Sequence, residues 1–131
     1  MERGVVNPWS WQDGFGFSQA VEITAGQRVL YCAGQASVDA DGRPMHPGDI
    51  VAQLNQALNN LDTVLKSSGF AIQDVVRLNY YTTDVDGLLS AYESLVKRLG
   101  EAGCRPASTL CGVTRLAFPE LLIEVEATAM K

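Results

Sequence analysis

Apolar residues recur along two stretches of the chain with the 3.6-residue spacing of helices. Between about residues 49 and 68 they form one stripe, made of Ile50, Leu54, Ala57, Leu58, Leu61, Val64 and Leu65. A second stripe follows Asp84 or Asp86, either of which can cap the helix start, and it consists of Leu88, Leu89, Tyr92, Leu95, Val96 and Leu99. The pattern predicts two amphipathic helices, each with one face directed at a core.

Segments rich in β-branched and aromatic residues surround these helices and predict strands. "FSQAVEIT" and "RVLYCAG" are separated only by "AGQ", so we expect them to form a hairpin with Gly26 in its turn. "DVVRLNYYTT", "STLCGV" and "LLIEVEATAM" are the later strands. The order is ββ, with room for a short strand before them, then αβαββ. It predicts a single α+β domain over residues 1–131, with two helices on one face of a mixed sheet.

The last strand has two different faces. Its apolar face suits the helices and comprises Leu121, Ile123, Val125, Ala127 and Ala129. The other face comprises Leu122, Glu124, Glu126 and Thr128, and the strand around residues 76–83 has a similarly mixed second face. A sheet face that is neither apolar nor fully polar is usually covered by another subunit, so we expect a homo-oligomer.

The composition excludes some classes of partner. A net charge of −5 argues against nonspecific nucleic-acid binding, and the absence of a long apolar run argues against a membrane-spanning helix. The N-terminus lacks the pattern of a signal peptide, so a cytoplasmic location is expected. An odd number of cysteines suits reduced thiols. We expect Cys104 to be exposed in its loop, and Cys32 and Cys111 to pack inside strands.

No motif for binding nucleotide phosphates or a metal is present in the sequence, so neither a metal nor a cofactor is expected. Glu124 and Glu126 are the clearest carboxylate pair, and the central position of Glu124 suits it to proton transfer. Glu126 could equally be a polar residue on a half-buried strand. Arg105 could grip an anionic ligand with two parallel hydrogen bonds, or it could be an exposed loop arginine.

The N-terminal "NPWSWQDGFGF" gathers four aromatic residues, Trp9, Trp11, Phe15 and Phe17, without a helical period. They could form a lid over the core or the wall of an apolar ligand pocket.

Several segments occur together in an order that resembles one known family. "FSQAV", "CAGQ" followed by "VDADG", "GDIVAQLNQALNNLDTVLKSSG", "DVVRLNYYTTD", "PAST" and "IEVEATA" are similar to the RidA (YjgF) family of enamine/imine deaminases. The resemblance implies a chorismate-mutase-like fold and a homotrimer whose sheets form a central barrel. It also implies sites in clefts between subunits, where water attacks a reactive enamine or imine without a metal or cofactor.

The resemblance also implies roles for particular residues. Glu124 matches the glutamate that positions water, Phe17 takes the place of a tyrosine, and Tyr92 that of an asparagine. Gly34 follows an alanine where the family has a serine. Aligning Ser108 and Thr109 of "PAST" with the family's "PARS" segment puts Ala107 at the position of its substrate-binding arginine. Arg105, two residues earlier, shares strand parity with that position.

The expected substrate-binding residues are therefore Arg105, Phe17, Gly34, Tyr92 and Thr109, with Glu124 as the catalytic group. The cleft should be more apolar than in the family, and its ligand a small anionic molecule. The leading hypothesis is hydrolysis or tautomerisation of an enamine or imine. The alternative is a non-catalytic trimer that binds a small molecule or a protein. Ribonuclease activity, found in some relatives, suits the acidic chain least.

Overall fold

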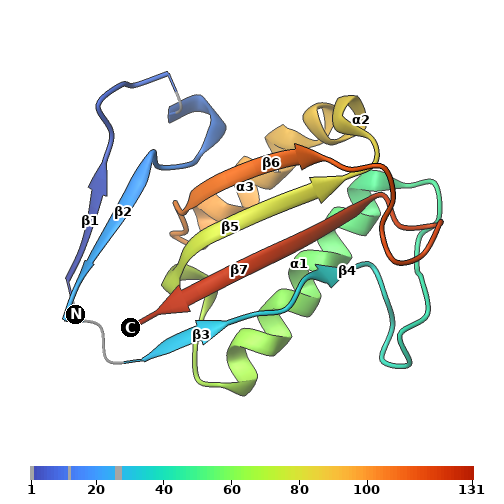
Figure 1. Cartoon of the computed structure of the whole chain (residues 1–131), viewed down its shortest axis with the longest axis horizontal. Helices are drawn as coiled ribbons and strands as arrows, with labels where there is room; N and C mark the ends of the chain where they lie inside the picture. The colour runs from blue at the N-terminus through green and yellow to red at the C-terminus, as the bar shows by residue number, and fades with distance from the viewer. Residues whose placement is uncertain (1, 12, 26–27) are drawn as a thin grey trace.

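The computed structural model describes residues 2–11, 13–25 and 28–131. Its main sheet has β7 at the centre, paired antiparallel with β5 on one side and with β3 and β4 on the other. β6 runs parallel to β5 and forms the far edge (Figure 1). The strands are β3 (Val29–Tyr31), β4 (Gln35–Ala36), β5 (Val75–Thr82), β6 (Ala107–Gly112) and β7 (Ile123–Met130).

Helices cover one face of this sheet and leave the other face open (Figure 1). They are α1 (Ile50–Ser67), α2 (Val85–Ser90) and α3 (Tyr92–Glu101). The α+β prediction and the first helix are confirmed, and the Asp49 carboxylate caps α1 by accepting the backbone N–H of Ala52 at 3.0 Å. The prediction of one continuous second helix is wrong. Ala91 has a ψ of −1°, far from the helical value of about −42°, and it separates α2 from α3.

The N-terminal strands form a separate two-stranded sheet beside the main one (Figure 1). β1 (Glu2–Val6) pairs antiparallel with β2 (Ala20–Thr24), so the predicted hairpin between β2 and β3 is wrong. β2 finds its partner in β1, whereas β3 finds its partner in β7 at the far end of the sequence. Gly26, predicted for the hairpin turn, lies outside the described residues. Short 3₁₀ turns occur at Asp13–Phe15 (η1) and Ile72–Asp74 (η2).

The core lies between the helices and the sheet. The two-faced prediction for the last strand is confirmed, because Ile123 and Val125 are fully buried while Glu124 and Glu126 lie on the open face. α1 contributes Gln53, Leu54, Ala57, Leu58, Leu61 and Leu65. Each such Leu contributes roughly 1.5–3 kcal/mol by leaving water.

Two of the three cysteine predictions are wrong. Cys104 is buried, because its backbone folds back onto α3 and donates its N–H to the carbonyl of Leu99 at 2.9 Å. Cys111 is exposed, because it shares the register of Tyr81 and so belongs to the open face. Cys32 is buried as predicted.

None of the helices within the described ranges is long and apolar enough to cross a membrane.

Candidate functional site

Glu124 lies on the open face of the sheet, close to the backbone of Gly34. A Cβ atom placed on Gly34 would be only 1.8 Å from Oε1 of Glu124, so the carboxylate occupies the space that a side chain at position 34 would need. Glu124 is half-buried. Across residues 2–11, 13–25 and 28–131, no side chain or backbone group hydrogen-bonds or ion-pairs with its carboxylate. The structure thus brings together Glu124 and Gly34 and leaves the carboxylate open to a ligand.

The neighbouring carboxylate, Glu126, is in a different situation. Its Oε1 accepts hydrogen bonds from Nδ2 of Asn79 at 3.2 Å and from the hydroxyl of Tyr81 at 3.0 Å. The bond to Glu126 raises the pKa of the Tyr81 hydroxyl, because the phenol is the donor and the carboxylate repels a phenolate. Glu126 therefore ties β7 to β5, whereas Glu124 has no comparable structural task.

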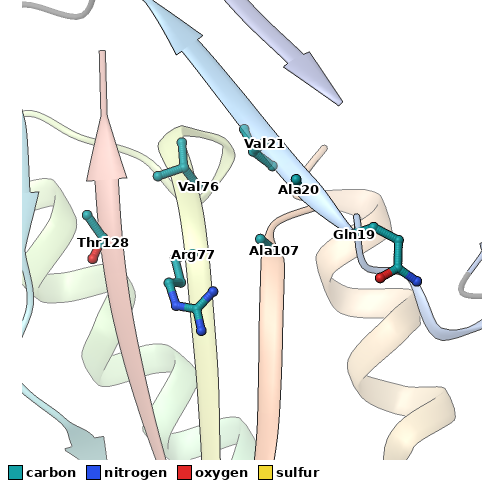
Figure 2. Close-up of a pocket in the computed structure, with 7 residues that line it drawn as sticks. All are labelled: Gln19, Ala20, Val21, Val76, Arg77, Ala107 and Thr128. Atoms are coloured by element: carbon teal, nitrogen blue, oxygen red, sulfur yellow. The ribbon is translucent and has the colours of Figure 1, made fainter. Parts of the chain in front are cut away.

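Thr109, another predicted ligand-binding residue, also faces the open side. Its hydroxyl accepts a hydrogen bond from Nη2 of Arg77 at 3.1 Å. Arg77 is the direct cross-strand neighbour of Ala107, and Figure 2 shows it between Ala107 of β6 and Thr128 of β7. A hollow of about 380 Å³ lies here, where β2 passes beside β5 and β6. The guanidinium group of Arg77 is thus one strand away from Ala107, and the sequence analysis did not identify Arg77 as a neighbour of that position.

Phe17 and Tyr92 lie elsewhere, in an apolar groove at the β6 edge of the sheet. The groove has a volume of about 260 Å³, and its lining consists of Trp11, Phe15, Phe17, Val85, Leu89, Tyr92 and Leu110. Leu110 pairs with Tyr80, which is buried under the helices, so the groove is on the helix side of the sheet. Two roles were considered for the N-terminal aromatic residues, and three of them, Trp11, Phe15 and Phe17, form part of the wall of this groove. Trp9 is 60% exposed and does not line the groove.

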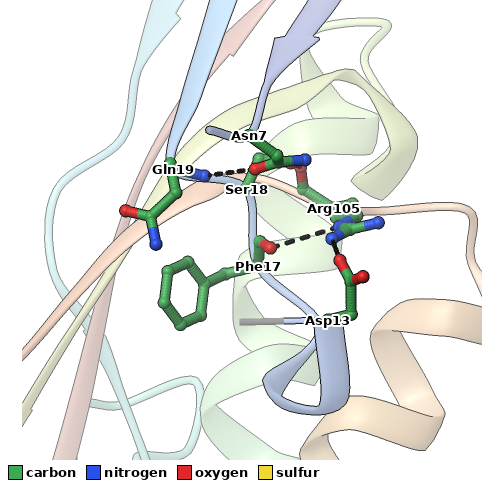
Figure 3. A network of polar contacts seen from close by, with 6 residues as sticks. All are labelled: Asn7, Asp13, Phe17, Ser18, Gln19 and Arg105. Atoms are coloured by element: carbon green, nitrogen blue, oxygen red, sulfur yellow. Dashed lines mark hydrogen bonds and ion pairs between the residues drawn. The ribbon is translucent and has the colours of Figure 1, made fainter. Parts of the chain in front are cut away.

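Arg105 is directed at the N-terminal segment and not along β6. Its Nε donates to the backbone carbonyl of Phe17 at 3.1 Å, and its Nη2 pairs with the carboxylate of Asp13 (Figure 3). The side chain is 41% exposed. Ser18 completes the junction, because its N–H donates to the carbonyl of Pro106 and its hydroxyl to the carbonyl of Arg105, both at 2.9 Å. Arg105 therefore fastens the wall of the groove to the start of β6.

The predicted site residues form separate groups within one chain. Glu124 is level with Cys111 through the register of β7, β5 and β6, and Arg105 precedes Cys111 by six positions. Six residues of strand span roughly 20 Å, and β7 lies about 10 Å from β6. The groove is on the helix side of the sheet and Glu124 on the open side. One small ligand therefore cannot contact both parts of the same chain.

The groove includes Val85 and Leu110, which the sequence analysis did not single out, and Leu89, whose predicted place in the core-facing stripe is wrong because it is 50% exposed. A signal was present, because Val85, Leu89, Tyr92 and Val96 repeat at helical spacing, next to the buried Leu88, Leu95 and Leu99, although the sequence analysis merged most of them into one stripe. Val96 lies under the N-terminal loop, where a Cβ atom on Gly16 would be 3.2 Å from its Cγ1.

Comparison with known proteins identifies the family. The family model described as Endoribonuclease L-PSP matches residues 14–131, which is most of the chain. The chain belongs to the RidA (YjgF) family. A RutC family protein of Pyrococcus horikoshii is 33% identical over 115 residues, covering 88% of this chain and 86% of that protein. The 2-iminobutanoate/2-iminopropanoate deaminase of Rattus norvegicus is 31% identical and covers 88% of this chain and 80% of its own.

Solved structures of RidA-family proteins agree with the fold. The Rid-family protein YyfB of Yersinia pestis is 40% identical to this chain, with a TM-score of 0.89 and complete coverage of both chains. An Escherichia coli YjgF structure, at 23% identity and a TM-score of 0.70, supports the fold alone. The predicted family and fold class are thereby confirmed.

Proposed function

We propose that this RidA-family chain hydrolyses the C=N bond of a small, anionic imine or enamine, with Glu124 as the acid/base group. The observation that supports this proposal best is the contrast between the two carboxylates. Glu126 is occupied by Asn79 and Tyr81, whereas Glu124 projects over Gly34 and has no bonding partner among the described residues. The deaminase name of the rat relative is consistent with the same chemistry.

The proposed reaction needs only water as a second reactant. An enamine first takes up a proton at its β-carbon and releases one from its nitrogen, and thereby becomes the imine. Glu124 accepts a proton from a water molecule while the water oxygen bonds to the imine carbon and the C=N electron pair moves to nitrogen. Return of that proton to the nitrogen gives a carbinolamine. Glu124 then takes the proton of the carbinolamine hydroxyl and passes it to the amino group, so that the C–N bond breaks as the C=O bond forms, and a 2-oxo acid and ammonia leave. One positioned carboxylate can serve each proton transfer, with a typical gain of about 100- to 10,000-fold in rate.

A complete site requires two copies of the chain under this proposal. The groove with Phe17 and Tyr92 would come from one subunit and Glu124 with Gly34 from the next, because they lie on opposite faces of one sheet. This arrangement needs an oligomer, such as a homotrimer, in which the β6 edge of one subunit, which carries the groove, reaches the open sheet face of the next. The open face also carries Tyr31, which is 81% exposed in the single chain.

Arg105 is the expected partner of the anionic group. A guanidinium has five N–H donors, and the Phe17 carbonyl and Asp13 use two of them. An exposed ion pair such as Arg105–Asp13 contributes only about 0–1 kcal/mol, so a ligand carboxylate can compete for it.

The alternative is a non-catalytic trimer that binds a small molecule, which the replacement of polar cleft residues by Ala33, Phe17 and Ala107 favours. Ribonuclease activity, which the description of the family model names, is disfavoured by the net charge of −5.

The decisive experiment compares Glu124→Gln with the matched control Glu126→Gln. Imines are generated in solution from amino acids by an amino-acid oxidase, and the acceleration of ammonia release is measured. We expect Glu124→Gln to lose about 100- to 10,000-fold in kcat/KM while its melting temperature is unchanged. Glu126→Gln keeps an acceptor oxygen for Asn79 and Tyr81 and should retain activity. Full activity in Glu124→Gln would overturn the proposal, and ligand binding without acceleration by the wild type would support the binding module.

A further inference from the structure

The apolar groove is held open by contacts between aromatic rings. Trp11 packs edge-to-face on Phe15 and on Phe17, with ring centroids 6.4 and 5.7 Å apart. Phe15 packs in the same way on Tyr92 at 6.0 Å, and thereby connects the N-terminal segment to α3. Such pairs each contribute about 0.5–1.5 kcal/mol beyond the area that they bury. The walls therefore support one another, and the groove exists before any ligand arrives.

The outer wall is also fastened to the sheet. Arg105 and Pro106 hold Phe17 and Ser18 through three hydrogen bonds of 2.9–3.1 Å. On the opposite wall, Val85 is fixed against β6, since a Cβ atom on Gly112 would be 2.9 Å from its Cγ2. The groove thus lies between two anchored walls and cannot readily close by collapse of its aromatic side chains.

The chemistry of the lining selects an apolar occupant. All seven lining residues are aromatic or aliphatic, and the only polar group among their side chains, apart from the indole N–H, is the Tyr92 hydroxyl. Burial raises the pKa of that hydroxyl, so it is a neutral hydrogen-bond donor. A charged group would lose its hydration here without gaining a partner of opposite charge.

The size of the groove suits one ring or one branched side chain. An apolar cavity of about 150 Å³ already accommodates benzene. The volume of about 260 Å³ therefore admits a benzyl or isobutyl group but is below the range of about 300–1,000 Å³ typical of pockets that enclose a whole drug-sized ligand. The charged end of such a ligand would lie outside the groove, on the side where Arg105 contacts the Phe17 carbonyl.

We propose that the groove binds the side chain of the substrate, and that the substrate is an imine or enamine with an aromatic or branched aliphatic side chain. This inference rests on the proposed function, because it assigns the substrate class of the same site. Phe17 and Tyr92 connect the groove with the proposed site, since they belong both to the predicted substrate-binding residues and to the groove. A methyl group would leave most of the groove unfilled, whereas a benzyl group would bury its ring in a lining that contains four aromatic residues.

The test compares imines that differ only in their side chain. The full-length protein is given imines generated from alanine, leucine and phenylalanine, and kcat/KM for ammonia release is measured for each. Burial of the larger side chain predicts a preference of roughly 10- to 100-fold for the leucine and phenylalanine imines over the alanine imine. Equal rates, or a preference for the alanine imine, would overturn the inference while leaving the proposed function intact.

Variants on an exposed helix surface provide the control. Leu89 lines the groove and is 50% exposed, whereas Val51 on α1 is 44% exposed and lies outside it. Leu89→Ser should reduce the preference for large side chains at least fivefold, and Val51→Ser should leave the preference unchanged. An identical preference in both variants would show that the groove does not select the substrate.

A binding measurement separates the inference from catalysis. Calorimetry with the stable 2-oxo acids that carry methyl, isobutyl and benzyl side chains measures affinity without turnover. If no imine is hydrolysed, the proposed function fails, but tighter binding of the benzyl acid that is lost in Leu89→Ser would still support the groove as a side-chain site. Absence of any size dependence in binding would overturn it, as expected if a second copy of the chain fills the groove.

Discussion

Glu124 and Gly34 share one small volume on the open face of the sheet. A Cβ atom on Gly34 would lie 1.8 Å from Oε1, 2.7 Å from Cδ and 3.0 Å from Cγ of Glu124. The position of the carboxylate therefore depends on the absence of a side chain at a residue 90 positions away in the sequence.

The Gly34→Ala variant should displace the Glu124 carboxylate. Gly34 has no positive φ, so its backbone accepts alanine, but Glu124 must change its rotamer. We expect kcat to fall at least tenfold, while the free energy of unfolding changes by about 1 kcal/mol or less. Steady-state kinetics and denaturant titration measure the two effects. Gly100→Ala on α3 is the control, because no atom lies within 4 Å of its added Cβ. Unimpaired turnover in Gly34→Ala would contradict the role of Glu124.

The chain should form trimers in solution. The open sheet face carries both polar and aromatic groups, and a site that joins the groove to Glu124 needs two copies. Light scattering at micromolar concentration should give three times the chain mass of 14.1 kDa. A mass of 14.1 kDa under these conditions would exclude the shared site.

Arg105→Ala should loosen the groove wall. The variant loses the bond to the Phe17 carbonyl and the ion pair with Asp13, which together are worth about 1–2 kcal/mol for exposed groups. We expect a slightly lower melting temperature and a red-shifted tryptophan emission as Trp11 becomes more exposed. Affinity for an anionic ligand should also fall, and Arg105→Lys should restore only part of it, since an ammonium lacks the planar fork. Arg77→Ala, which loses only the bond to Thr109, should leave the tryptophan emission unchanged.

The three thiols should differ strongly in reactivity. Burial raises the pKa of Cys104 to about 12 and also raises the pKa of Cys32. A raised pKa lowers the thiolate fraction, which for Cys104 at pH 8 is about one in ten thousand, and the thiolate is the reactive form. Cys111 is exposed in the single chain, where only a neighbouring subunit could cover it, and should react first of the three with an aromatic disulfide reagent. The fast phase should vanish in Cys111→Ser, and a fast phase that persists there would contradict the burial of the other two thiols.

Local periodicity predicted the parts of the fold in which burial alternates along one element. The α1 stripe and the two faces of β7 are of this kind, because each side chain's environment follows from its position in a helix or strand. The partner of a strand is not encoded locally. β2 is as compatible with β3 as with β1, and only the positions of β1 and β7 in the folded chain determine the pairing.

The sequence provided candidate site residues but not their arrangement. The sequence favoured Glu124 by its central position, but it could not show that Glu126 accepts hydrogen bonds both from Asn79, its register partner, and from Tyr81, which lies opposite Glu124. The groove draws its lining from the N-terminal loop, α2, α3 and β6, so no single stretch of sequence reveals it.

Under the proposed function, the placement of the groove and of Glu124 on opposite faces of one sheet requires that each catalytic unit be formed by a pair of chains. Two inactive variants, Glu124→Gln and a groove variant such as Leu89→Lys, carry complementary defects. When they are unfolded together in equal amounts and refolded, about a quarter of the sites receive an intact groove from one parent and an intact carboxylate from the other. Activity regained on mixing would thus show that each site is shared between two chains, without any structure of the assembly.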